Sequence, residues 1–146
     1  EYSLIDTMNY TLQQSDNLFA ECFLRTLGAY YKNPNNANAE QNGFTAVRNI
    51  LQENGVDVST FVQDDGSGLS RHNLVSPRAM ADVLEMMGNT PNGDTYRSFL
   101  PVAGESGTLS SRFQGTPAQG IVEAKTGKAL SCWLLYSQKH RYYEWC

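Results

Sequence analysis

The chain has 146 residues, of which 40% are hydrophobic and 18% charged, and this ordinary globular balance excludes a disordered chain. Its net charge of −4 and pI near 5.1 give no electrostatic reason to expect nucleic acid or an anionic membrane as partner. The length allows about one domain or a piece of a larger one, and no apolar run is long enough to span a bilayer.

The first half of the chain is predicted to be helical. Helical spacing of apolar residues predicts a helix over 4–13, and Ser15 and Asp16 then interrupt it and can cap the next helix. That next helix, over about 17–31, has the strongest amphipathic pattern in the chain. Turn residues at 33–36 end it, and another amphipathic helix follows over about 40–54, closed by Gly55 in a left-handed conformation.

The second half is predicted to hold fewer regular elements. Phe61 and Val62 fit a short extended piece, and a helix opens at Ser76-Pro77 and stops at Gly88. Residues 89–119 are rich in Gly, Ser and Pro, with short helical possibilities around 96–100 and 108–113. Residues 121–125 read as a strand, whose partner must come from the final segment or from chain outside this sequence. The expected fold class is therefore α/β (α+β), a helical cluster plus this strand.

Two tripeptides carry the chemistry: Ser15-Asp16-Asn17 between two helices and Lys125-Thr126-Gly127 at the exit of the strand. Each would occur by chance in about 2% of chains of this length, and both in this order much more rarely. They match two of the three elements found in the active site of penicillin-recognising serine enzymes.

The residue types suit acyl transfer, which needs a nucleophilic serine, a base, and a relay that protonates the leaving amine. Ser15 is predicted to be the relay hydroxyl, and Lys125 to tune it and attract the substrate carboxylate. Asn17 and Thr126 are predicted to bind the substrate backbone and its terminal carboxylate. Gly127 leaves room for an extended peptide along the strand edge, and the backbone N–H of Lys128 is the expected oxyanion donor.

Beyond the tripeptides, longer stretches resemble the low-molecular-mass class C penicillin-binding proteins, the D-alanyl-D-alanine carboxypeptidase/endopeptidase family. The resembling stretches are residues 15–21 (SDNLFAE), 24–28 (LRTLG), 65–77 (DGSGLSRHNLVSP), 100–104 (LPVAG), 107–109 (GTL) and 124–127 (AKTG). Together they cover about residues 5–127 and favour this family over the serine β-lactamases.

The resemblance implies a partial penicillin-binding, β-lactamase-like transpeptidase fold. Residues 1–127 would be the C-terminal part of the catalytic domain and 128–146 a divergent or truncated tail. It also implies hydrolysis of peptidoglycan stem peptides ending in D-Ala-D-Ala, reaction of the intact protein with β-lactam antibiotics, and a periplasmic or extracytoplasmic location. No metal or organic cofactor is implied.

Two features depart from the family pattern. None of the serines is followed three residues later by lysine, so the Ser-x-x-Lys motif that supplies the nucleophile and its base is not in this sequence. We expect the chain to start inside a domain, since it opens on Glu1-Tyr2-Ser3-Leu4, and to be inactive alone. After Gly127 the sequence has strand character but not the family's pattern.

Several other interpretations remain open. The chain could be a catalytically silent remnant, or a domain that holds peptidoglycan peptide without cutting it. Ser15 could simply cap a helix, the acidic turn at 64–68 could be mistaken for a cation loop, and His72 or His140 could suggest a serine–histidine triad. Cys22 is expected to be buried on its helix, because three cysteines without paired spacing indicate neither a disulfide framework nor a zinc site.

Overall fold

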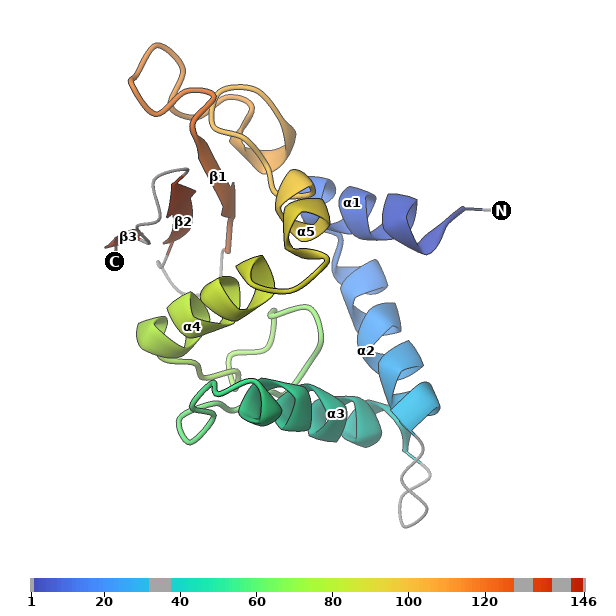
Figure 1. The fold of residues 1–146 in the computed structure, drawn as a ribbon. Helices are drawn as coiled ribbons and strands as arrows, with labels where there is room; N and C mark the ends of the chain where they lie inside the picture. Colours follow the sequence, from blue (N-terminus) through green and yellow to red (C-terminus); the bar gives the residue numbers. More distant parts are fainter. Residues whose placement is uncertain (1, 32–37, 128–132, 138–142, 146) are drawn as a thin grey trace. The chain divides into compact units, whose positions relative to one another are not determined.

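The computed structural model describes residues 2–31, 38–127, 133–137 and 143–145. They form two compact units, one built from residues 1–16 and 87–146 and the other from residues 17–86. Their elements, labelled in Figure 1, are treated unit by unit.

The unit of residues 17–86 is helical. It contains α2 (Asn17–Tyr31), α3 (Ala39–Glu53) and most of α4 (Pro77–Gly88), which confirms the three helices predicted there. The backbones of α2 and α3 approach closely: a Cβ on Gly28 would lie 1.7 Å from the carbonyl oxygen of Ala39. Only glycine permits this approach, so the crossing of the two helices depends on Gly28.

The core of this unit lies at the end of α3, where the chain turns back at Gly55. Leu51, Val56 and Val58 are buried there, and partly buried apolar side chains of Val47, Phe61, Val83 and Met86 pack against them. Gly55 has φ +83, the left-handed conformation predicted for it. The short extended piece is also confirmed, because Val62 forms a bridge with Leu74.

The expectation that Cys22 is buried is wrong: the residue is exposed. Leu24 and Gly28, which are buried, lie one helical turn apart on the face of α2 that meets α3. Cys22 is two residues from Leu24, about 200° around the helix axis, and therefore points away from that face.

The other unit holds α1 (Leu4–Gln14), α5 (Gly93–Ser98), a 3-10 turn η1 (Gly107–Leu109) and an antiparallel sheet of order β1-β2-β3. The strands are β1 (Val122–Lys125), β2 (Trp133–Ser137) and β3 (Tyr143–Trp145). The predicted strand is confirmed, and the final segment supplies its partner, with Ala124 opposite Leu135. Figure 1 shows the three strands side by side. The two short helical elements are shifted from their predicted places: α5 starts three residues before position 96, and η1 is a single turn.

The segment just before η1 covers the second side of β1. Ala103 donates its backbone N–H to Val122, and Ala124 donates to Pro101, each at 2.9 Å. Ala103 and Ala124 are buried, as is Leu109 of η1, so this contact is part of the core. Among the described residues, pairing on this side of β1 ends at Ala124, immediately before the Lys-Thr-Gly tripeptide.

Candidate active site

Ser15 ends α1 in a left-handed conformation, with φ 56 and ψ 50. The carbonyl oxygen of Thr11 accepts the N–H groups of both Ser15 and Asp16, bonds that close a helix whose C-terminal residue is left-handed. Ser15 thus terminates the preceding helix, whereas the sequence suggested that it caps the following one. A left-handed backbone costs a non-glycine residue about 1–2 kcal/mol, and such residues concentrate at functional sites.

The structure brings Ser15 and Lys125 together, although 110 positions separate them in the chain. Nζ of Lys125 lies 2.7 Å from Oγ of Ser15 and 2.6 Å from the carbonyl oxygen of Thr126. The lysine is half-buried at the end of β1, and this burial lowers the pKa of its amine. An amine with a lowered pKa exchanges protons more readily near neutral pH than an ordinary surface lysine does.

Thr126 extends the same group of side chains. Its Oγ1 lies 3.0 Å from Oγ1 of Thr108, on η1. Thr126 was predicted as a site residue, but Thr108 was not. The tripeptide Gly-Thr-Leu at 107–109 contributed to the family resemblance, and this was the signal that could have found Thr108.

A close contact between η1 and α1 positions Thr108. Gly107 has φ +53, and a Cβ there would lie 2.5 Å from Oε1 and 2.8 Å from the carbonyl oxygen of Gln13. Gln13 also donates from Nε2 to the carbonyl oxygen of Phe99 at 3.0 Å. The last turn of α1, which presents Ser15, is therefore attached to the segment that carries Thr108.

The remaining predicted site residues are less closely defined. Asn17 is the exposed first residue of α2 and belongs to the other unit. Gly127 is exposed directly after β1, and Lys128 lies outside the described residues. Their roles as substrate contacts stay predictions.

This arrangement can carry out proton transfer. A lysine ammonium donates hydrogen bonds but accepts none, so at 2.7 Å the Ser15 oxygen must be the acceptor. The proton of the Ser15 hydroxyl is then available to a different partner. A hydroxyl that receives a hydrogen bond from an ammonium and donates its own proton elsewhere is suited to protonate a leaving amine.

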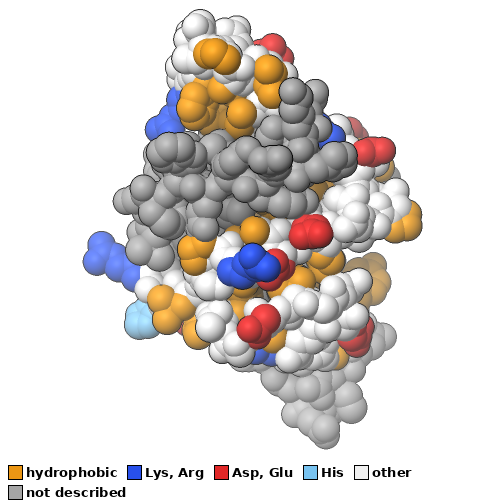
Figure 2. All heavy atoms as spheres, turned by 60° about the vertical axis from the view of Figure 1, so that its left-hand side comes forward, with side chains coloured by type: hydrophobic (Ala, Val, Ile, Leu, Met, Phe, Trp, Pro, Cys, Tyr) orange, Lys and Arg blue, Asp and Glu red, His pale blue; other side chains and the backbone are white. Residues whose placement is uncertain are grey.

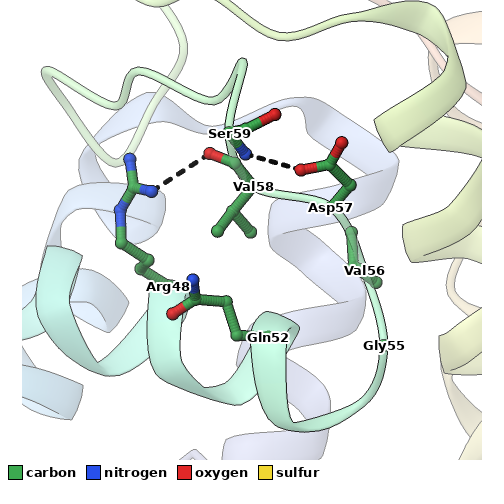
Figure 3. A pocket seen from close by; sticks show the side chains of 7 residues that line it. All are labelled: Arg48, Gln52, Gly55, Val56, Asp57, Val58 and Ser59. Atoms are coloured by element: carbon green, nitrogen blue, oxygen red, sulfur yellow. Dashed lines mark hydrogen bonds between the residues drawn. The ribbon is translucent and has the colours of Figure 1, made fainter.

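A hollow in the other unit is shown in Figure 3. It has a volume of about 400 Å³ and is lined by Arg48, Gln52 and residues 55–59. Arg48 is directed at backbone oxygens, donating to Val58 at 3.0 Å and to Phe61 at 2.7 Å. Hydrogen bonds from Ser59 lower the pKa of Asp57. Both charged groups have structural partners, so this hollow has no evident reactive group.

The described part of the chain gives little support to a histidine triad or to a cation loop at 64–68. His72 is exposed in the unit without Ser15, and His140 lies outside the described residues. In the turn at 64–68, Asp65 accepts hydrogen bonds from the N–H of Ser70 and from the Asn73 amide. Nowhere in residues 2–31, 38–127, 133–137 or 143–145 do three or more His, Cys, Asp or Glu side chains form a group that could hold a metal ion.

The distribution of charge on the surface and the apolarity of the helices complete the description. Basic and acidic side chains are interspersed on the face shown in Figure 2. No described helix is both long enough and apolar enough to cross a membrane.

The two paired motifs on this helix-rich fold are typical of penicillin-recognising serine enzymes. Comparison with known sequences identifies the family. Residues 2–132 match the D-Ala-D-Ala carboxypeptidase 3 (S13) family, and the chain belongs to it. The family predicted from the resembling stretches is confirmed.

Curated relatives agree with this assignment. The chain is 45% identical over 129 residues to penicillin-sensitive carboxypeptidase A of Dictyostelium discoideum, covering 85% of this chain and 24% of the relative. It is 42% identical over 118 residues to a D-alanyl-D-alanine carboxypeptidase of Actinomadura sp. (strain R39), covering 77% and 21% respectively. The chain thus spans less than a quarter of the length of these relatives.

Solved structures confirm the fold class. The chain is similar to penicillin binding protein 4 (dacB) from Haemophilus influenzae, with a TM-score of 0.77 and 36% identity, over 90% of this chain and 29% of that one. A second structure of that protein, complexed with a β-lactam, matches with a TM-score of 0.78 and 34% identity, over 90% of this chain and 30% of that one. The fold is a helix-rich part of the penicillin-binding fold with little strand.

Proposed function

We propose that this chain is the part of a serine-type D-Ala-D-Ala carboxypeptidase/endopeptidase that carries the proton relay and the carboxylate-binding strand. The observation that carries the proposal is the 2.7 Å hydrogen bond between Nζ of Lys125 and Oγ of Ser15. The substrate would be a peptidoglycan stem peptide ending in D-Ala-D-Ala, processed outside the cytoplasmic membrane. β-lactams would acylate the serine that attacks this substrate, which comes from a segment outside this sequence.

The reaction needs a serine from a Ser-x-x-Lys segment, which this sequence does not contain. That serine gives its proton to the lysine of the same segment and attacks the carbonyl carbon of the penultimate D-Ala, forming an ester and breaking the C–N bond to the last residue. The leaving amine takes the Ser15 hydroxyl proton, and the Lys125 ammonium replaces it. Water then hydrolyses the ester and releases the shortened peptide.

Substrate binding follows from the same elements. The Lys125 charge and the Thr126 hydroxyl would attract the terminal carboxylate, and Asn17 would contact the substrate backbone. Pairing on one side of β1 ends at Ala124, so an extended peptide could continue along Thr126 and Gly127. The N–H of Lys128 would then be an oxyanion donor.

The proposal is tested with labelled penicillin and mass spectrometry. The 146-residue chain alone should form no covalent adduct. A polypeptide in which a Ser-x-x-Lys segment from a family member precedes the chain should be acylated. Ser15→Ala or Lys125→Ala should then slow acylation by about a hundredfold or more.

The matched control is Thr7→Val, which removes a hydroxyl bonded to the carbonyl oxygen of Ser3 near the far end of α1. It should leave the acylation rate unchanged. An adduct on the 146-residue chain would mean that a different serine attacks, which contradicts the assigned roles. Peptide binding without acylation of the extended protein would favour a non-catalytic binding domain instead.

A further inference from the structure

Thr108 places a hydroxyl directly against the site without a role in the reaction described above. Its Oγ1 lies 3.0 Å from Oγ1 of Thr126, and both residues are half-buried. The two threonines come from different elements, η1 and the end of β1, so tertiary structure alone brings them together.

Thr108 lies in a firmly held segment. The neighbouring Leu109 is fully buried, and its carbonyl oxygen accepts the N–H of Gly104 at 3.0 Å. The hydroxyl of Ser106 accepts the N–H of Val102 at 3.0 Å, and Val102 forms a bridge with Glu123 of β1. The position of η1 relative to β1 is therefore fixed by hydrogen bonds on both sides of Thr108.

The direction of the threonine–threonine hydrogen bond matters for binding an anion. Each hydroxyl has one proton and can also accept, whereas an ionised carboxylate only accepts. If Thr126 gave its proton to Thr108, it would have none to offer a carboxylate. In the structure the Thr126 hydroxyl donates to Thr108. The pair can therefore bind an anion only if both hydroxyls rotate on binding, so that Thr108 donates to Thr126 and Thr126 donates outward, and such a chain of hydroxyls strengthens its terminal bond.

We propose that Thr108 is a positioning residue that fixes the rotamer of Thr126 and directs its proton outward, which makes the site selective for peptides with a free terminal carboxylate. The proposal rests on the proposed function and adds the residue that sets this selectivity. A peptide whose last residue is amidated or extended offers no terminal carboxylate there and gains nothing from the pair.

The test uses the 146-residue chain and two ligands, N-acetyl-D-Ala-D-Ala and its C-terminal amide, titrated by NMR at the Thr126 methyl and the Gly127 amide. The wild-type chain should bind the acid at least about tenfold more tightly than the amide, because hydrogen bonds to charged groups are the stronger ones. Thr108→Val, which keeps the shape but loses the hydroxyl, should reduce this ratio about three- to tenfold. Thr108→Ser should restore it.

A second readout does not depend on ligand. Three-bond couplings to the Thr126 methyl should report one χ1 rotamer in the wild type and an averaged one in Thr108→Val. Thr7→Val should change neither readout, because the hydroxyl of Thr7 bonds to Ser3.

The outcomes separate the two proposals. If Thr108→Val weakens acid and amide equally, or leaves the ratio and the rotamer unchanged, Thr108 is only structural and the inference is overturned. If the wild-type chain shows no preference for the acid, the carboxylate role of Thr126 in the proposed function fails, and the inference fails with it.

Discussion

Replacing Lys125 by methionine should remove the proposed proton relay without destabilising the fold. Methionine keeps the length of the side chain but loses the ammonium and its two hydrogen bonds, to Ser15 and to the carbonyl oxygen of Thr126. Hydrogen bonds to charged groups contribute about 1.5–3 kcal/mol each, whereas desolvating an ammonium costs several kcal/mol. These two contributions oppose each other at this position.

The pKa of Lys125 indicates which contribution is larger. Burial lowers the pKa of the amine, so the charged form is less favourable in the folded chain than in water even with both hydrogen bonds present. Because the side chain is only half-buried, solvent screens much of this cost. We therefore expect Lys125→Met to leave the free energy of unfolding at pH 7 unchanged or to raise it by up to about 1 kcal/mol.

The difference in the free energy of unfolding between Lys125→Met and the wild type should depend on pH. Below the lowered pKa of the folded state, Lys125 is protonated in both the folded and the unfolded chain. In that pH range the full cost of burying its charge lowers the free energy of unfolding. As the pH rises through the folded pKa toward the ordinary value of about 10.4, the unfolded chain binds more protons and the wild type gains stability. The advantage of Lys125→Met should accordingly shrink between pH 7 and about pH 10.5.

Urea unfolding followed by tryptophan fluorescence measures this effect. Both tryptophans, Trp133 and Trp145, belong to the sheet that contains Lys125. Arg71→Met, at an exposed cation of the other unit, is the control and should shift stability by less than about 0.5 kcal/mol at either pH. A loss of more than about 1 kcal/mol at pH 7 in Lys125→Met would refute the reasoning, because the hydrogen bonds would then outweigh desolvation.

Two substitutions test individual contacts, and a labelling experiment tests the exposure of Cys22. Gly107→Ala should destabilise the unit containing α1 by about 2 kcal/mol or more in urea unfolding, because it combines a positive φ with a clash against the end of α1. Glu21→Ala should speed hydrogen exchange of the Gly66 amide about tenfold, because Oε1 of Glu21 accepts the N–H groups of Gly66 and Ser67 at 2.8 and 3.1 Å. Cys22 should react with iodoacetamide in the folded chain, as peptide mapping by mass spectrometry would show, because it is exposed.

The two substitutions each have a control. Gly88→Ala should be well tolerated, since a Cβ there meets no atom within 4 Å and its φ is not positive. Glu85→Ala, at an exposed position of α4, should leave the Gly66 amide unchanged. Equal stability of the two glycine variants, or equal exchange in both glutamate variants, would contradict the contact tested. A Cys22 that reacts only in urea would contradict its exposure in the folded chain.

Much of the local structure followed from the sequence alone. The helices, the turn at Gly55 and the strand before Thr126 were predictable because apolar periodicity and capping residues act over a few neighbouring positions. The short elements after Gly88 were misplaced by a few residues, since segments rich in Gly, Ser and Pro carry little periodic signal. The burial of Cys22 was misjudged because the pattern did not show which face of α2 meets α3.

The sequence by itself determined the family and the pair of motifs, because the residue types required by the chemistry are specific and their order is rarely found by chance. It did not determine how those residues meet. Tertiary structure placed Lys125 against Ser15 and Thr108 against Thr126, and it put Ser15 in a left-handed helix end. These contacts join residues up to 110 positions apart, and only the packing of α1, η1 and β1 around a common core fixes such distances.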